Sequence, residues 1–273
     1  MTGVSGGRTL VMLKLGGSLI TEKDGDAEAR ADVIVRLARE IAEGAEETDA
    51  RLLVGHGSGS FGHPPAAEHD LRHGTEGDEQ RLGLSRTQRR AAELHRRVVE
   101  ALVAAGVPGF SVVPSSAAVA EDGRVADFAG EPLMRALGGG YVPVVYGDVM
   151  MDRTRGSTIA STEAVFLHLA SLLEDTGWRV DRALWLGSTD GVLDREGRPL
   201  PRIDRGPDGG LPNAVEGSAA TDVTGGMRHR VETALRMAAL GVPSWIGDGR
   251  RPGTLRRALV GEMQGGTRVP TGR

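Results

Sequence analysis

Three glycine-rich segments of the chain carry the residue types that phosphate chemistry uses. In the first, KLGGS, Lys14 ends a short apolar run and precedes Gly16 and Gly17, whose backbone N–H groups could surround phosphate oxygens. A fixed cation and amides of this kind stabilise the charge that moves through the transferring oxygens during phosphoryl transfer. The segment is not a Walker A loop, and it equally fits a strand lysine beside an ordinary glycine turn.

The second segment, HGSGSFGH, places three glycines and two serines between His56 and His63. Side chains this small let a ligand reach the main chain. His63 could donate a hydrogen bond to an acceptor phosphate, and His56 could orient the loop. Two histidines seven positions apart also suggest a metal site, but the intervening glycines and the lack of an adjacent Cys or carboxylate count against one.

The third segment, DVTGGMRHR, runs from Asp222 to Arg230 and puts a glycine pair before cations at the start of an expected helix. Because a helix N-terminus favours anions, this segment could also bind phosphate. The alternative is a capped helix with a solvated basic face.

The elements that must position these segments alternate along the chain. Strands are expected at 9–15, 51–54, 110–113, 141–145, 180–186 and 242–246, and helices at 27–42, 79–105, 161–174 and 223–240. A hairpin at 150–159, an exposed excursion at 195–210, a short edge strand after Gly265 and an N-cap at Ser161 are also expected. This alternation predicts an α/β fold with an open, mainly parallel sheet.

The composition narrows the class of protein. A chain of 273 residues with 39% hydrophobic and 26% charged residues is typical of a globular domain with a substantial core. The net charge of -4 gives no broad basic surface for nucleic acid or an anionic membrane, so a phosphate site must be local. The absence of cysteine excludes disulfides, thiolate metal sites and cysteine nucleophiles. Because no targeting segment or long apolar stretch is found, a cytoplasmic location is expected.

The ordered set of motifs resembles the isopentenyl phosphate kinases of the amino acid kinase superfamily. The shared segments are KLGGSLIT, HGSGSFGHP, the PSS at 114–116, VPVVYGDV, TDGV, DVTGGM and ALVGEMQGGT. Each is weak alone, but their order and spacing are specific and cover almost the whole chain. The resemblance implies a three-layer αβα sandwich in a single domain, with an acceptor-binding lobe at about 1–178, a nucleotide-binding lobe at about 179–273, and a homodimer formed across the acceptor-binding half.

Position by position, the resemblance implies two groups of ligand-binding residues. ATP, accompanied by magnesium, would contact Lys14, Gly16, Gly17, Ser18, Lys23, Gly59, Asp190, Gly225, Gly226 and Arg228. The acceptor phosphate would contact Ser58, Gly59, His63, Gly147, Asp148 and Thr162. Lys14, His63 and Arg228 would be catalytic, and no side chain is assigned to a metal.

Some positions depart from the family's pattern. The family usually has Lys where Arg228 stands, a Gly-Asp-Asp run where Thr162, Glu163 and Ala164 stand, and Thr-Asp where Gly187 and Ser188 stand. Arginine keeps the charge but replaces a compact ammonium with a planar fork. The other departures alter oxygen ligands beside the nucleotide.

The expected reaction is direct in-line transfer from ATP to isopentenyl phosphate, without a phosphoenzyme. Cations and glycine-loop amides would offset the repulsion between the two anions. Two alternatives stay open: a kinase for another small phosphate or phosphonate, similar to the fosfomycin kinases, and a regulatory module that binds nucleotide without turnover. The DVTGGM segment favours the isopentenyl phosphate interpretation, and neither a nucleic acid nor a membrane partner is expected.

Overall fold

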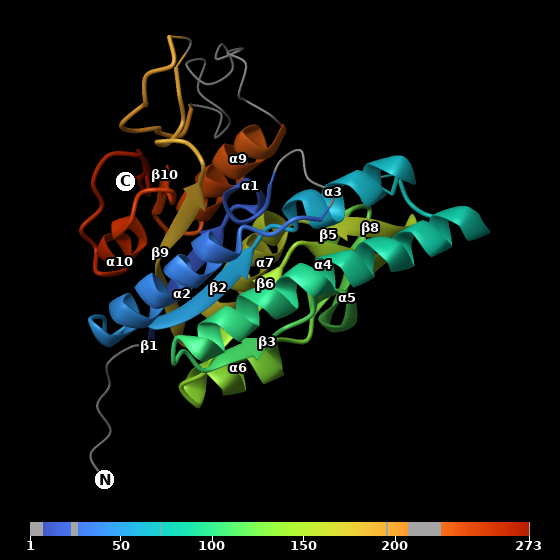
Figure 1. Cartoon of the computed structure of the whole chain (residues 1–273), viewed down its shortest axis with the longest axis horizontal. Coiled ribbons are helices and arrows are strands. Elements are labelled where there is room, and N and C mark those ends of the chain that lie inside the picture. Colours follow the sequence, from blue (N-terminus) through green and yellow to red (C-terminus); the bar gives the residue numbers. More distant parts are fainter. Residues whose placement is uncertain (1–7, 23–26, 72, 195, 207–224, 273) are drawn as a thin grey trace.

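A parallel sheet forms the centre of the computed structural model, which describes residues 8–22, 27–71, 73–194, 196–206 and 225–272 (Figure 1). In spatial order its strands are β11 (Thr267–Val269), β10 (Ser244–Asp248), β9 (Trp178–Gly187), β1 (Arg8–Leu15), β2 (Arg51–His56), β6 (Val142–Tyr146) and β3 (Gly109–Ser111). Neighbouring strands run parallel except β10 and β11. The predicted strands are confirmed, including the short edge strand near the end of the chain.

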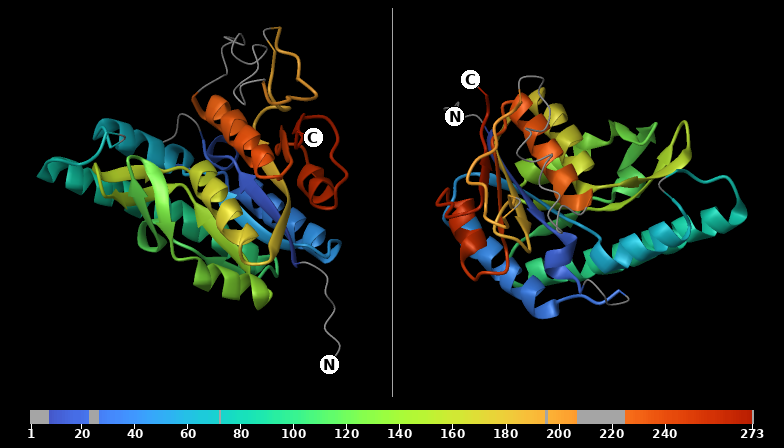
Figure 2. Two further views of the ribbon diagram at one scale, coloured as in Figure 1. Left: turned by 180° about the vertical axis from the view of Figure 1, so that it is seen from behind. Right: turned by 90° about the horizontal axis from the view of Figure 1, so that it is seen from above.

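Helices cover both faces of this sheet (Figure 2). One face carries α2 (Ala31–Glu46), α4 (Asp78–Ala104) and α10 (Thr254–Leu259). The other carries α6 (Gly130–Gly138), α7 (Thr162–Glu174) and α9 (Gly225–Ala239). Three short helices, α1 (Gly17–Ile20), α3 (Gly59–Glu68) and α5 (Pro114–Ala117), follow strand ends. The predicted three-layer αβα sandwich is therefore confirmed.

The two helical layers explain why β1 is apolar along nearly its whole length. Val11 and Leu13 pack with the helices of one layer, whereas Leu10 and Met12 pack with those of the other. Because side chains alternate along a strand, a strand buried on both faces needs apolar residues at odd and even positions. The same alternation puts Lys14 on the face of Leu10 and Met12, toward α7 and α9.

A second, four-stranded sheet is formed by residues 118–160. Its strands are, in order, β5 (Arg124–Phe128), β4 (Ala118–Glu121), β7 (Asp148–Asp152) and β8 (Gly156–Ala160). The hairpin predicted at 150–159 is confirmed as β7 and β8. The β4–β5 hairpin was not predicted. Its turn residues Asp122 and Gly123 have φ values of 49° and 77°, as a two-residue hairpin turn of the primed type requires.

Several element boundaries differ from the prediction. Helix α2 begins at Ala31 rather than near residue 27, and α3 begins inside the second glycine segment, which was predicted as a loop. Pro64 and Pro65 lie in α3, so its sequence has little intrinsic helix preference and tertiary contacts decide. Ser161 is confirmed as an N-cap, because its hydroxyl accepts a hydrogen bond from the Ala164 amide (3.1 Å). Residues 195 and 207–210 of the predicted excursion lie outside the described residues, as do residues 223–224 of the helix predicted at 223–240.

Candidate active site

The glycine segments meet at the edge of the sheet where parallel strands end. Strands β1 and β9 are neighbours, and the helices that follow them, α2 and α9, pack on opposite faces. Ligands of open α/β sheets bind in the crevice outside such a pair of strands. Gly16 and Gly187 flank this point, and the Gly16 amide donates to the Leu186 carbonyl at the end of β9 (2.7 Å).

Three buried charges lie beside this crevice. Lys14 at the end of β1 forms an ion pair with Glu163 in the first turn of α7, and each residue is only 5% exposed. Arg230 on α9 is 9% exposed and acts electrostatically on both. Burial lowers the pKa of Lys14, and the charge of Glu163 opposes that shift. Although burial alone would raise the pKa of Glu163, Lys14 and Arg230 lower it to about 2. Glu163 therefore favours the charged form of Lys14 and compensates the charge of Arg230 in a buried site.

Two glycines leave room for the guanidinium of Arg230. A Cβ atom on Gly187 would stand 2.7 Å from Nη1 of Arg230, and one on Gly16 would stand 3.3 Å from Nη2. The arginine fork therefore spans the gap between the ends of β1 and β9. Its planar array of N–H donors suits phosphate oxygens.

The first and second glycine segments contact each other backbone to backbone. A Cβ on Gly17 would stand 2.6 Å from the amide nitrogen of Gly59, and one on Gly57 would stand 2.7 Å from that of Gly17. Gly59 also has a φ of 49°, in the region that favours glycine. The Gly57 amide donates to the Leu15 carbonyl (2.9 Å). The two loops thus form one close-packed surface of main-chain groups.

Residues predicted to contact the acceptor phosphate gather around the end of β2. The carbonyl of His56 accepts from the Thr162 hydroxyl (2.7 Å) and from the Gly147 amide (2.9 Å). Ser58 is close to Gly147, since a Cβ there would stand 3.5 Å from the Ser58 hydroxyl. Asp148 is buried, and burial raises the pKa of its carboxyl group against the hydrogen bonds that it accepts from Ser115 and Tyr146.

Most of the remaining predicted residues are less buried. Ser18 is exposed, and its hydroxyl lies 3.3 Å from that of Ser188. Asp190 faces Arg251, with 3.3 Å between Oδ2 and Nη2. Gly225 and Gly226 form the first residues of α9, and His63 is exposed on α3. Lys23 lies outside the described residues.

The structure does not bring Arg228 to the buried charges. Its side chain is 63% exposed, and its Nε donates to Oε1 of Glu232 one turn later on α9 (2.9 Å). Arg230, two positions on, faces the sheet instead. Sequence reasoning missed Arg230, although a signal existed: Arg230, Ala234 and Met237 follow the i, i+4, i+7 spacing of a buried helical stripe.

Within the described ranges, no group of three or more His, Cys, Asp or Glu side chains could hold a metal ion. The carboxylate of Glu163 already pairs with Lys14. The site thus offers cations and amides to anionic ligands rather than a carboxylate cage. Among the helices that the structure describes, none combines the length and apolar character that a membrane crossing requires.

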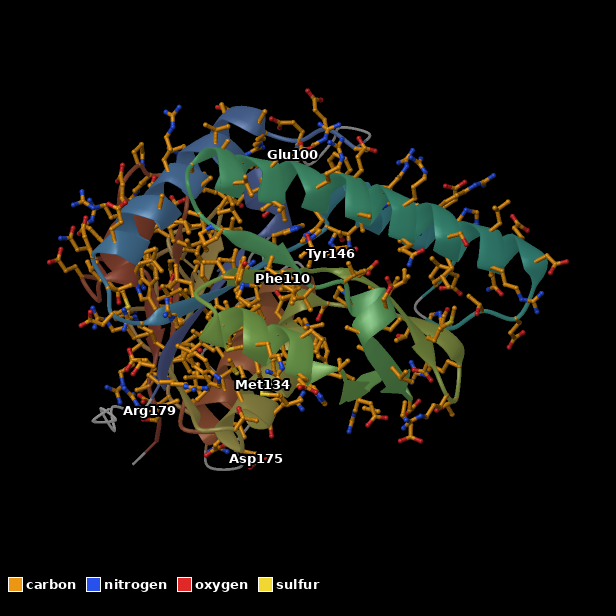
Figure 3. All side chains as sticks on the ribbon, turned by 90° about the horizontal axis from the view of Figure 1, so that it is seen from below. Glu100, Phe110, Met134, Tyr146, Asp175 and Arg179 are labelled. Atoms are coloured by element: carbon orange, nitrogen blue, oxygen red, sulfur yellow. The ribbon has the colours of Figure 1, made fainter. Side chains whose placement is uncertain are left out.

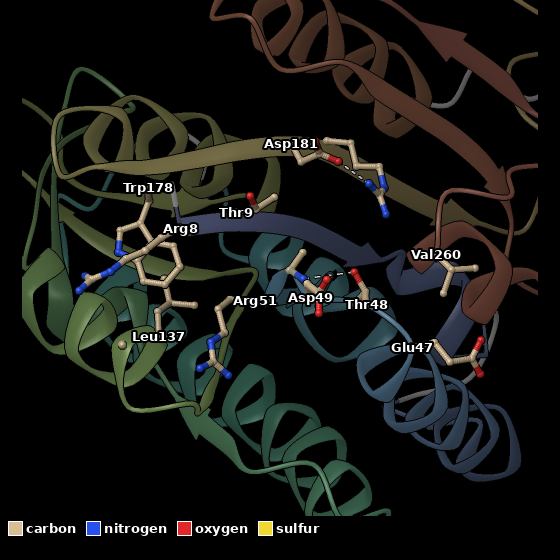
Figure 4. A pocket seen from close by; sticks show the side chains of 13 residues that line it. Arg8, Thr9, Glu47, Thr48, Asp49, Arg51, Leu137, Trp178, Asp181 and Val260 are labelled. Atoms are coloured by element: carbon tan, nitrogen blue, oxygen red, sulfur yellow. Dashed lines mark hydrogen bonds and ion pairs between the residues drawn. The ribbon is translucent and has the colours of Figure 1, made fainter. Parts of the chain in front are cut away.

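A cavity of about 560 Å³ opens at the opposite edge of the sheet (Figure 4). It lies at the amino ends of β1, β2 and β9, where Arg8, Arg51 and Trp178 contribute to its lining. The glycine segments and the buried charges are at the carboxyl ends of the same strands. This cavity is therefore separate from the candidate active site.

Comparisons with known proteins agree with this architecture. Residues 9–248 match the model of the amino acid kinase family. The chain is 35% identical to the isopentenyl phosphate kinase of Methanothermobacter thermautotrophicus, over 95% of this chain and 98% of that protein. It is 29% identical to the isopentenyl phosphate kinase of Methanocaldococcus jannaschii, over 94% and 97%. A solved isopentenyl phosphate kinase structure superposes with a TM-score of 0.79 at 32% identity, covering 95% of this chain and 99% of its own. The chain belongs to the amino acid kinase family.

Proposed function

We propose that this protein transfers the γ-phosphoryl group of ATP directly to isopentenyl phosphate, forming isopentenyl diphosphate and ADP. The observation that carries the proposal is the pair of buried cations, Lys14 and Arg230, held by Glu163 where two glycine loops meet. Similarity to isopentenyl phosphate kinases over nearly the whole chain supports the choice of acceptor.

The reaction brings two phosphate groups together, so mutual repulsion is the main barrier to positioning. Lys14 and Arg230 offset this repulsion from a site of low water content, where a charge interaction is stronger than in bulk water. Because the sheet and α9 fix both cations, little reorganisation accompanies the transfer. The amides of the glycine loops bind the remaining phosphate oxygens.

Nucleotide and acceptor approach this pair from different halves of the chain. The nucleotide-binding lobe comprises about 179–273 and the acceptor-binding lobe about 1–178, and the first glycine loop of the acceptor-binding lobe reaches the nucleotide. The nucleotide contacts Gly16, Gly17, Ser18, Gly59, Asp190, Gly225 and Gly226. The acceptor phosphate lies near Ser58, His63, Gly147, Asp148 and Thr162, and its tail contacts apolar residues at about 82–119.

Magnesium would accompany ATP and would be bound in part by the phosphates of the nucleotide. When bound, it neutralises part of the phosphate charge. The carboxylate of Glu163 interacts with Lys14 and Arg230, so it is already used to compensate these cations.

The protein acts in the cytoplasm as a homodimer formed across the acceptor-binding half. Apolar side chains are exposed beside edge strand β3: Val103 is 57% exposed, Phe110 40% and Tyr141 50%. Figure 3 shows Phe110 on the side of the molecule where α4 and β3 meet. A second copy would cover these side chains and the unpaired edge of β3.

The test is ADP release with isopentenyl phosphate, dimethylallyl phosphate and a phosphonate as separate acceptors. Preference for isopentenyl phosphate in kcat/KM supports the proposal. Preference for the phosphonate would reassign the acceptor, and ATP binding without turnover on any of the three would indicate a regulatory module.

A further inference from the structure

A chain of hydrogen bonds runs from the outer edge of the sheet to the second glycine loop. The Ser111 hydroxyl on β3 lies 3.0 Å from Nε2 of His95 on α4. Nδ1 of His95 lies 3.1 Å from Nε2 of His56, and Nδ1 of His56 lies 3.1 Å from the carbonyl oxygen of Gly57. His56 is fully buried and His95 is 5% exposed, so the hydrogen bond between the two rings is protected from water.

The carbonyl oxygen of Gly57, the last acceptor in the series, sets the donor-to-acceptor direction of every hydrogen bond in it. The Gly57 carbonyl can only accept, so His56 must carry its proton on Nδ1 and use Nε2 as an acceptor. His95 must then donate from Nδ1, which leaves its Nε2 to accept from the Ser111 hydroxyl. Each ring is neutral in this arrangement. Burial supports neutrality, since it lowers the pKa of His56 to about 4 and that of His95 to about 3.

Tyr146 holds the two imidazoles in a stack. Its ring centroid lies 4.2 Å from that of His95 and 5.7 Å from that of His56, with interplanar angles of 20° and 11°. Tyr146 is buried at the end of β6, below α4 in Figure 3, and the next two residues are Gly147 and Asp148. The stack therefore joins α4 to the ends of β2 and β6.

The outer end of the hydrogen-bond series, at Ser111, faces a groove of about 420 Å³ between α4 and β3. His95 and Ser111 lie in its wall, together with Val99 and Val103. A water molecule held in this groove, with or without a second copy covering α4 and β3, can replace the Ser111 hydroxyl as a donor. The inner link, in contrast, joins two buried rings. The essential link is therefore the one between the two imidazoles.

We infer that His95 is a positioning residue for phosphoryl transfer, which acts through His56 to fix the Gly57 carbonyl and hold the second glycine loop against the first. The role follows from the close contact of Gly57 with the first loop, since a Cβ atom on Gly57 would stand 2.7 Å from the amide nitrogen of Gly17. Loop position matters most in the transition state, so loss of the link lowers kcat more than it raises KM. This inference rests on the proposed function for its kinetic consequence, but not for the proton positions.

The first test reads the proton positions without turnover. Two-dimensional ¹H–¹⁵N NMR of the histidine rings in the whole protein distinguishes protonated from unprotonated ring nitrogens. The expected result is a proton on Nδ1 and none on Nε2, for both His56 and His95, near neutral pH. A proton on Nε2 of His56 would overturn the inference. Because no substrate is present, this result is independent of whether isopentenyl phosphate is the acceptor.

The second test compares substitutions at His95. His95→Phe keeps a ring on Tyr146 but removes the donor, and it should lower kcat about 10- to 100-fold with both KM values changed less than about threefold. His95→Asn places an amide donor near the Nδ1 position and should restore kcat to within about threefold of the wild type. Ser111→Ala should also stay within about threefold, because a water molecule held in the groove can take the place of the hydroxyl.

A matched control separates loss of the hydrogen bond from a general effect of the substitution. His168→Phe alters a part-buried histidine on α7 beside Phe128, away from the glycine loops, and should leave kcat unchanged. Wild-type kcat in His95→Phe, or failure of His95→Asn to recover activity in a folded protein, would overturn the positioning role. Absence of wild-type turnover with isopentenyl phosphate would instead contradict the proposed function.

Discussion

Lys14 and Glu163 form a buried ion pair that joins the central strand β1 to the first turn of α7. The pair is not isolated, since Arg230 approaches the same carboxylate from α9. One negative charge thus stands between two cations in a site with little water. This arrangement makes the stability of the apo protein and its activity depend on the same residue.

Replacing Glu163 with Gln should lower both the stability and the activity of the protein, because it leaves two buried cations without a counter-charge. We expect the free energy of unfolding to fall by about 3–5 kcal/mol, as when one partner of a buried pair is removed. Urea denaturation of the apo protein measures this change, with Glu163→Asp as the control that keeps the charge. An unfolding free energy equal to that of the wild type would show that the carboxylate does not compensate the cations.

The stability of the protein should fall in two stages as the pH is lowered. The unfolded chain binds protons on His56 and His95 near pH 6.5, whereas their folded pKa values are about 4 and about 3, so stability is lost below pH 6.5. Each histidine contributes up to about 1.4 kcal/mol per pH unit. Glu163 adds a second loss between its ordinary pKa of 4.5 and about 2. Urea denaturation over a series of pH values measures the slope, and His95→Asn should reduce the slope of the first stage by about half.

Gly187 and Arg230 should behave as a coupled pair. Gly187→Ala would put a Cβ 2.7 Å from Nη1 of Arg230, and the displaced guanidinium should lower kcat at least about tenfold. Arg230→Lys removes the fork that the new methyl group strikes. In the double variant, Gly187→Ala should therefore lower kcat little beyond the effect of Arg230→Lys alone. Steady-state kinetics of the wild type, the two single variants and the double variant measure the coupling. Strict additivity would contradict the contact.

Substitutions of Arg228 and Arg230, which both lie on α9, should have different effects on catalysis. Arg228→Ala removes an exposed ion pair with Glu232, so kcat should change less than about threefold. Arg230→Met should lower kcat/KM about 100- to 1,000-fold, as when one transition-state donor is removed. The reverse ranking in the same assay would support Arg228, rather than Arg230, as the catalytic cation.

Because the two glycine loops are in close contact, we expect that Gly17 cannot be replaced by a residue with a side chain without loss of stability. Gly17→Ala would bring a Cβ within 2.6 Å of the Gly59 amide nitrogen, and we expect it to destabilise the protein by about 1–3 kcal/mol and weaken ATP binding. Gly138→Ala is the control, because no atom lies within 4 Å of its added Cβ; its effect should be at most about 1 kcal/mol. Thermal unfolding and calorimetric titration with ATP measure the two effects. Equal behaviour of both variants would argue against the close contact.

Sequence reasoning located the strands and the loops that follow them, but not which helix face meets the sheet. Apolar runs such as the one before Lys14 are long and uninterrupted because both faces are buried. Arg228 and Arg230 are only two positions apart, and a helix turns by about 200° over that interval. A choice between them requires the buried stripe of α9, which becomes clear only when its packing partners are known.

The β4–β5 hairpin and helix α3 were missed for different reasons. Asp122 and Gly123 form a turn signal between two short strands, and this signal was available in the sequence. Helix α3 offered no comparable signal, since glycine and proline disfavour helix and its formation depends on contacts with α4. Glu163 was recognised as a departure from the family pattern, but its pairing with Lys14 joins residues 149 positions apart.

The central position of β1 has an evolutionary consequence. Lys14 lies on a strand with a parallel neighbour on each side, paired through Leu15 with His56 of β2 and Leu186 of β9. A residue held in this way cannot be moved without disturbing the core, so selection for a new acceptor must act elsewhere. The outer strand β5 and the far end of α4 are more exposed, and relatives with different acceptors should differ there first.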